Sequence, residues 1–154
     1  MTAFHNYITN CYYWLHTAFL LLQKNIVQVG KSILIADDEP DIREFISYNL
    51  TKQGYSVFKA SNGLEALELA IKIKPSLIIL DIMMPEMNGF ETSRKMRENI
   101  VLDNSRIFFL SAMSEAMART SGHQIFVDGF IPKPISIRDL MVKIKSLIAE
   151  DELN

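Results

Sequence analysis

Short apolar segments alternate with amphipathic segments along the chain from residue 31 onward. Three of the apolar segments, at residues 32–36, 77–80 and 107–110, are continuous hydrophobic runs. Such runs are typical of strands that are buried on both faces of a parallel sheet. Residues 55–59 and 129–131 form two weaker segments of the same kind. The pattern therefore predicts five strands, each followed by a more polar segment.

The segments between the strands carry the start and stop signals of helices. Pro40 suits the first turn of a helix, and Gly54 and Pro75 end two of the periodic segments. Asn62 with Glu65 three residues later resembles a capping box, and Asn88 can cap the next helix. Two further helices are expected from Ser114 and from Ser136. Alternating strands and helices predict an α/β fold, a doubly wound five-stranded parallel sheet with helices on both faces.

Polar residues interrupt the pattern where the predicted strands end. Asp37 and Asp38 follow the first strand, Asp81 the third, Ser111 the fourth and Lys133 the fifth. Ligands of open parallel sheets bind beyond the carboxyl ends of the strands, near the point where the strand order reverses. We therefore expect these five residues, distant in sequence, to share one pocket.

Such a pocket has the chemistry for moving a phosphoryl group. Clustered carboxylates repel one another, and Mg²⁺, which prefers oxygen ligands and phosphate, relieves this repulsion. A carboxylate beside the metal can attack phosphorus, while Lys133 and the Ser111 hydroxyl stabilise the phosphoryl oxygens. Each residue has an ordinary alternative: a solvated acidic loop, a turn acid, a surface lysine or a strand-end hydroxyl. Their combination at four strand ends favours phosphoryl transfer.

Residues 1–30 differ from the rest of the chain. They contain no acidic residue and one basic residue, Lys24, and the stretch Cys11–Leu22 is nearly all apolar. This stretch is shorter than the roughly 20 residues of a membrane-spanning helix, and it lacks the basic start of a signal peptide. We expect a helical or disordered N-terminal extension without chemistry of its own. The alternative is a helix that docks on a membrane surface or a partner.

The net charge and the cysteine content indicate which partners and which compartment to expect. The net charge of −2 gives no basic surplus for nucleic acid, so no nucleic-acid partner is expected. Cys11 is the single cysteine and cannot form an internal disulfide, which fits a cytoplasmic protein.

The segment from about Lys31 to Ala149 resembles a response-regulator receiver domain of bacterial two-component systems. The matching stretches are ILIADDEPDIREF, LIILDIMMPEMNGFE, FFLSAM and DGFIPKP. Ser111 follows Asp81 by 30 residues and Lys133 follows it by 52, which also fits the family. The resemblance implies a flavodoxin-like strand order of 2-1-3-4-5 and a cis peptide bond before Pro134. It assigns residues 31–150 to the receiver domain and leaves residues 151–154 as a tail.

The resemblance also implies a role for each site residue. Asp81 would be the phosphoacceptor, and Mg²⁺ would be held by Asp37, Asp38, Asp81 and the backbone carbonyl of Met83. Lys133 would contact the phosphate. Ser111 would move toward the phosphate, and Phe130, at the switch aromatic position, would then rotate inward. By contrast, His123 has no neighbouring His or Cys cluster in the sequence and is expected to be a surface histidine.

Three functions compete on these residues. The first is a stand-alone receiver, phosphorylated by a sensor histidine kinase, which signals through protein–protein contact because the chain ends soon after the last helix. The second is a phosphorelay intermediate that passes the phosphoryl group to a histidine phosphotransfer protein. The third is a small Mg²⁺-dependent phosphohydrolase, which usually needs a second acid where Met83 stands. In the first two, the protein would catalyse only its own phosphorylation and dephosphorylation and would not be an enzyme.

Overall fold

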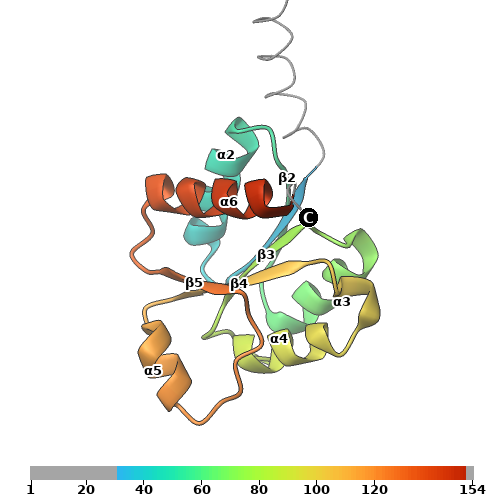
Figure 1. Cartoon of the computed structure of the whole chain (residues 1–154), viewed down its shortest axis with the longest axis vertical. Coiled ribbons are helices and arrows are strands. Elements are labelled where there is room, and N and C mark those ends of the chain that lie inside the picture. Colours follow the sequence, from blue (N-terminus) through green and yellow to red (C-terminus); the bar gives the residue numbers. More distant parts are fainter. Residues whose placement is uncertain (1–30, 152–154) are drawn as a thin grey trace, which may run out of the picture.

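One parallel sheet of five strands forms the centre of the molecule (Figure 1). The computed structural model describes residues 31–151 of the chain. The strands lie in the order β2-β1-β3-β4-β5. Their bounds are β1 Ser32–Ala36, β2 Ser56–Ala60, β3 Leu77–Asp81, β4 Arg106–Ser111 and β5 Gly129–Pro132. Both the predicted doubly wound parallel sheet and its predicted strand order are confirmed.

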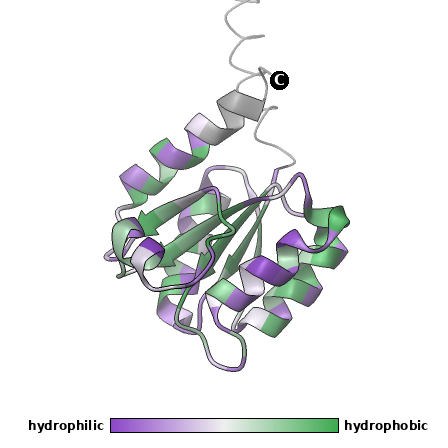
Figure 2. Ribbon diagram, turned by 60° about the horizontal axis from the view of Figure 1, so that its bottom comes forward, coloured by the Kyte–Doolittle hydropathy of each residue, from purple (hydrophilic) through white to green (hydrophobic). Residues whose placement is uncertain are grey.

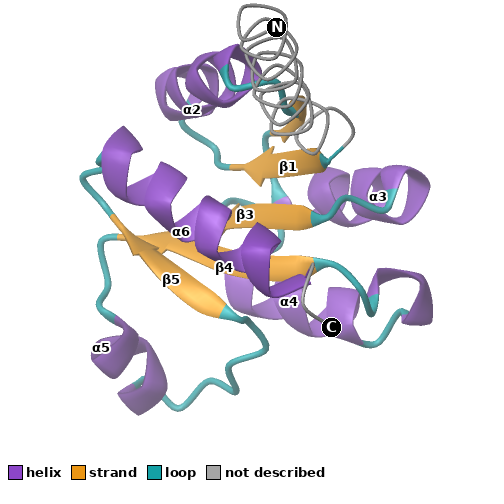
Figure 3. Ribbon diagram, turned by 45° about the horizontal axis from the view of Figure 1, so that its top comes forward, coloured by secondary structure: helices purple, strands orange, loops and turns teal. Residues whose placement is uncertain are grey.

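Helices cover both faces of this sheet (Figure 3). On one face, α2 and α6 bury apolar residues against the sheet, among them Ile46 and Leu140. On the other face, α3, α4 and α5 contribute Ala66, Met96 and Ala118 to a second cluster. The bounds are α2 Pro40–Lys52, α3 Gly63–Ile73, α4 Gly89–Arg97, α5 Glu115–Thr120 and α6 Ile137–Asp151. The strands are therefore buried on both faces, as their continuous apolar runs predict.

Three helices begin at the polar residues from which the sequence predicts them to start. The side chains of Asn62, Asn88 and Ser114 each accept a hydrogen bond from the backbone N–H three residues later. These caps satisfy N–H groups that have no partner within the helix. The carboxylate of Glu65 accepts from the N–H and hydroxyl of Ser61, so it caps the residue before Asn62.

Two local features differ from the sequence prediction. Strand β2 lies one residue later than expected, because Tyr55 is buried beside Ile46 and Leu50 in the core instead of pairing in the sheet. A short 3-10 helix, η1 Ile100–Leu102, precedes β4 and had no clear periodic signal. The hydropathy of the chain follows the layers, with apolar strands inside and mixed helices outside (Figure 2).

Residues 1–30, for which we expected a helical or disordered extension or a docking helix, lie outside the described residues. Within residues 31–151, no helix combines the length and hydrophobicity that a membrane crossing requires.

Candidate functional site

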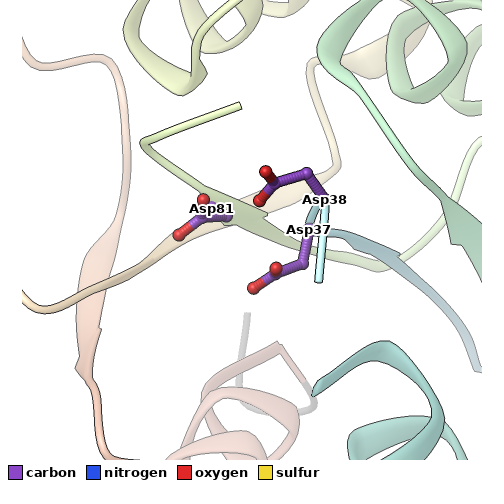
Figure 4. Close-up of side chains that lie close together, drawn as sticks. All are labelled: Asp37, Asp38 and Asp81. Carbon is purple, nitrogen blue, oxygen red and sulfur yellow. The ribbon is translucent and has the colours of Figure 1, made fainter. Parts of the chain in front are cut away.

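Three aspartates from two neighbouring strands converge at the carboxyl edge of the sheet (Figure 4). Asp37 and Asp38 directly follow β1, and Asp81 is the last residue of β3, which pairs with β1. One carboxylate oxygen of each residue lies within 4.8 Å of the others. Asp37 and Asp81 are buried, whereas Asp38 is exposed. The acidic cluster that the sequence predicts is therefore assembled by the strand order.

Lys133, directly after β5, reaches across to these acids. Its Nζ lies 2.9 Å from Asp37 Oδ2 and 3.1 Å from Asp81 Oδ1. A third carboxylate, Glu39 Oε1, lies 3.2 Å from the same nitrogen. The contact with Glu39 was not predicted, although Glu39 directly follows the two aspartates and could have been considered. One ammonium group is thus shared by three carboxylates.

This sharing leaves the site with an excess of negative charge. Burial raises the pKa of the Asp81 carboxyl above its ordinary value, and the Asp37 charge raises that pKa further. Lys133 lowers the pKa of Asp81, but not enough to reverse the shift. Burial alone would lower the pKa of Lys133, yet its hydrogen bonds to Asp37 and Asp81 outweigh burial and the net pKa is raised. The site therefore keeps its lysine charged and favours a further cation.

Backbone contacts hold the two acidic strand ends in place. The N–H of Met83 donates to Asp81 Oδ2 at 3.0 Å, and the N–H of Glu39 donates to Asp37 Oδ1 at 2.9 Å. Arg43, one turn into α2, donates to the carbonyl oxygen of Asp37. The loop after β3 also folds back on itself, since the N–H of Gly89 donates to the carbonyl of Ile82 at 2.9 Å.

Gly89 packs directly against the backbone that carries Asp81. A Cβ at this position would lie 2.4 Å from the Asp81 carbonyl oxygen and 2.8 Å from Ile82 Cα. Because the neighbouring atoms are backbone, Gly89→Ala is expected to destabilise the fold by about 1–3 kcal/mol. Urea unfolding measures this change. Glu91→Ala, on the exposed side of the same helix, should change stability by no more than about 0.5 kcal/mol. Equal stability of Gly89→Ala and the wild type would contradict the close contact.

Ser111 and Phe130 lie on the strands beside Asp81. Ser111 is the buried last residue of β4, and its Oγ accepts a hydrogen bond from the N–H of Met113 at 2.9 Å. The ring of Phe130 on β5 is 8% exposed and meets Phe109 edge to face. The inward position that we expected only after phosphorylation is thus the position described here. By contrast, the Met83 side chain is 75% exposed on the loop after β3.

Comparison with known proteins identifies the family. Residues 33–145 match the family model described as "Response regulator receiver domain". The chain belongs to this family. The receiver domain is 34% identical over 125 residues to the alkaline phosphatase synthesis transcriptional regulatory protein PhoP of Bacillus subtilis, covering 81% of this chain and 51% of that protein. It is 36% identical over 120 residues to the transcriptional regulatory protein SrrA of Staphylococcus aureus, covering 78% of this chain and 48% of that protein. The chain thus spans about half the length of these curated relatives.

Solved structures resemble the receiver domain over their whole length. The chemotaxis protein CheY4 of Vibrio cholerae superposes with a TM-score of 0.70 at 29% identity, covering 75% of this chain and 97% of that one. The response regulator TrrA of Thermotoga maritima was solved in complex with Mg²⁺ and BeF. It superposes with a TM-score of 0.67 at 34% identity, covering 76% of this chain and 98% of that one. The peptide bond between Lys133 and Pro134 is cis in the receiver domain, as the resemblance implied.

The acidic cluster of the receiver domain suits a hard divalent cation. Asp37 Oδ2 is buried, and the ammonium that lies 2.9 Å from it, Lys133 Nζ, is shared with Asp81 and Glu39. Buried carboxylates are costly unless cations neutralise them, and one ammonium does not balance three carboxylates. The three carboxylates are all-oxygen ligands, which Mg²⁺ prefers. Among the side chains described in residues 31–146, no other group of three or more potential metal ligands occurs, and His123 lies apart on the surface.

Mg²⁺ is expected to stabilise the receiver domain through these acids. At a concentration 100-fold above its dissociation constant, a ligand that binds only the folded state adds about 2.7 kcal/mol. Asp38→Asn should lose most of this gain, whereas Asp103→Asn, an exposed acid beside η1, should keep it. Thermal unfolding with Mg²⁺ and with EDTA measures the difference. An equal Mg²⁺ response of both variants would exclude Asp38 as a ligand.

Proposed function

We propose that this receiver domain is a phosphorylation-dependent signalling switch in which Asp81 accepts a phosphoryl group from a sensor histidine kinase. One observation carries the proposal: the Lys133 ammonium lies 3.1 Å from Asp81 Oδ1, within the cluster of Asp37, Asp38 and Asp81. A nucleophile, a fixed positive charge and a set of metal ligands thus meet at one strand edge. Their combination is what transfer of a phosphoryl group to a carboxylate needs.

The site residues would serve as the nucleophile, the positive charge and the metal ligands of the transfer. A carboxylate oxygen of Asp81 forms a bond to phosphorus, and the bond from phosphorus to the donor breaks, with its electron pair leaving on the donor. Lys133 stabilises the charge on the phosphoryl oxygens, because its ammonium already lies beside the Asp81 carboxylate. Asp37, Asp38, Asp81 and the Met83 carbonyl would hold Mg²⁺. The bound Mg²⁺ would supply further neutralisation of the phosphoryl charge.

The phosphoryl group would then act on the neighbouring strands. It adds nearly two negative charges and three acceptor oxygens to Asp81. The Ser111 hydroxyl can turn from the Met113 N–H toward these oxygens and leave room beside Phe130. Since Phe130 is already buried, the phosphate would favour the inward ring position over an outward one instead of creating it. A partner protein that binds the surface of α5, β5 and α6 would then distinguish the two positions of the Phe130 ring.

The residue two positions after Asp81 favours a switch over a hydrolase of metabolites. An aspartyl-phosphate hydrolase usually needs a general acid two residues after its nucleophile, and here that residue is the exposed Met83. The protein would catalyse only its own phosphorylation and dephosphorylation. The cytoplasm, where histidine kinases present their phosphoryl groups, is the compartment that this role implies.

Incubation of the purified protein with acetyl phosphate tests the proposal. With Mg²⁺, we expect the mass of the protein to increase by one phosphoryl group, and with EDTA we expect no increase. A protein that gains no phosphoryl group under either condition would refute the proposed function. If the phosphorylated protein passes its label to an added histidine phosphotransfer domain, the relay alternative is favoured over a terminal switch.

A further inference from the structure

Four aromatic rings form a continuous row from the edge of the sheet to the molecular surface. Phe130 on β5 meets Phe109 on β4 with ring centroids 5.6 Å apart and planes at 71°. Phe109 meets Phe90 at 5.3 Å and 78°. Phe90 in turn stacks on His123 at 4.4 Å and 21°. Edge-to-face and stacked contacts of this kind are the favoured geometries of aromatic pairs.

The inner end of the row lies beside the phosphorylation site. Phe130 pairs in register with Phe109, and Phe109 stands two residues before Ser111, so that it shares a face of β4 with Ser111. Phe109 has no solvent exposure, and its ring is therefore enclosed on all sides. In a close-packed interior, a ring of this size cannot move without displacing its neighbours. A change at Phe130 therefore has to be accommodated by Phe109.

The outer end of the row forms part of a surface cleft. Phe90 is the second residue of α4, and His123 lies in the segment between α5 and β5. Together with Arg94, Gln124 and Phe126, these two rings line a cleft of about 290 Å³. His123 is exposed, and the described contact that fixes its ring is the stack on Phe90. The shape of this cleft therefore depends on where Phe90 holds the imidazole.

We infer that the row Phe130–Phe109–Phe90–His123 transmits the phosphorylation state of Asp81 to the cleft at His123. The inference rests on the proposed function, since it needs Phe130 to respond to the phosphoryl group. With Phe130 inward, the row is complete and His123 is held on Phe90. With Phe130 outward, Phe109 loses one of its two ring contacts, and Phe90 and His123 relax. The cleft is thus a second surface on which the two states of the switch differ.

The imidazole signals of His123 in NMR spectra report this coupling, because the stacked Phe90 ring shifts them. The sequence contains three histidines, so the signals are assigned by their absence in His123→Gln. Adding beryllofluoride with Mg²⁺, as a mimic of the phosphoryl group, is expected to shift the amide signals of Ser111 and Phe130 and also the His123 ring. In Phe109→Leu, the amide shift at Ser111 should persist, while the His123 shift falls to at most about half.

Two further variants keep the test decisive. Phe130→Leu removes the inner ring of the same row but keeps the Phe90 ring beside His123, and it should have the same effect even if Phe109→Leu does not fold. Phe58→Leu, a matched change on the opposite edge strand β2, should leave the His123 shift intact. A His123 ring that does not respond while Ser111 does, or that responds fully in Phe130→Leu, would overturn the inference and leave the proposed function standing. An absent response at Ser111 itself would instead refute the proposed function.

Discussion

Replacement of Asp81 by Asn is expected to abolish phosphorylation by acetyl phosphate and, in the absence of Mg²⁺, to make the fold more stable at neutral pH. The first effect follows because the amide lacks the nucleophilic carboxylate. The second follows because burial and the neighbouring Asp37 raise the pKa of Asp81 in the folded state. The folded state therefore binds the proton more tightly than the unfolded chain does. Ionisation of Asp81 costs stability, and a neutral Asn avoids that cost.

Because the pKa of Asp81 is raised in the folded state, the free energy of unfolding depends on pH. The stability associated with protonated Asp81 is fully present below the unfolded pKa and is lost as the pH rises through the raised folded pKa. In EDTA, wild-type stability should thus fall over the lower part of a series from about pH 4 to pH 7, while Asp81→Asn should fall less. Urea unfolding at each pH measures the two curves, with Asp103→Asn as the matched control. A variant that is less stable than the wild type at neutral pH in EDTA would contradict this electrostatic account.

Replacement of Lys133 by Met is expected to have the largest effect on stability. Lys133 Nζ lies within 3.2 Å of carboxylate oxygens of Asp37, Asp81 and Glu39, and its side chain is only 17% exposed. Without the ammonium, buried Asp37 and Asp81 face each other with no compensating charge. Removing one partner of a buried ion pair costs about 3–5 kcal/mol. We expect a loss of this size at neutral pH in EDTA and a smaller loss when Mg²⁺ supplies the missing charge.

Two variants separate charge from packing in this prediction. Lys133→Arg keeps a positive charge and should recover part of the lost stability, although its planar head cannot reproduce every contact. Lys72→Met, at an exposed position near the end of α3, should change stability by no more than about 0.5 kcal/mol. Urea unfolding with EDTA and with Mg²⁺ compares all three variants. If Lys133→Met is as stable as Lys72→Met in EDTA, the lysine does not balance the charge of the acids.

The acidic cluster could be predicted from the sequence because it depends on topology alone. Continuous apolar runs identify buried parallel strands, and the carboxyl ends of such strands meet at one edge. Asp37, Asp38 and Asp81 interrupt the pattern at those ends, so their meeting does not depend on the details of packing. Lys133 is positioned in the same way by β5. The helix caps at Asn62 and Asn88 were predictable for a similar reason, since capping is a local interaction.

The remaining features depend on side-chain directions in three dimensions. Glu39 directly follows the acidic pair, but only the reach of Lys133 from β5 brings it into the site. The inward ring of Phe130, its contact with Phe109 and the contact of Phe109 with Phe90 result from packing between three elements. The one-residue shift of β2 arises because Tyr55 packs with α2 in the core. The predictions of a stand-alone receiver and of particular boundaries for the domain remain predictions.

The location of the phosphoryl group on the chain decides whether Asp81 is the phosphoacceptor. The protein is phosphorylated with acetyl phosphate and Mg²⁺, and the acyl phosphate is reduced with borohydride, which converts a phosphorylated aspartate into homoserine. Peptide mass spectrometry then locates the modified residue. We expect homoserine at position 81, with Asp37 and Asp38 unmodified. Homoserine at position 37 or 38, or a phosphoryl group carried by His123, would contradict it.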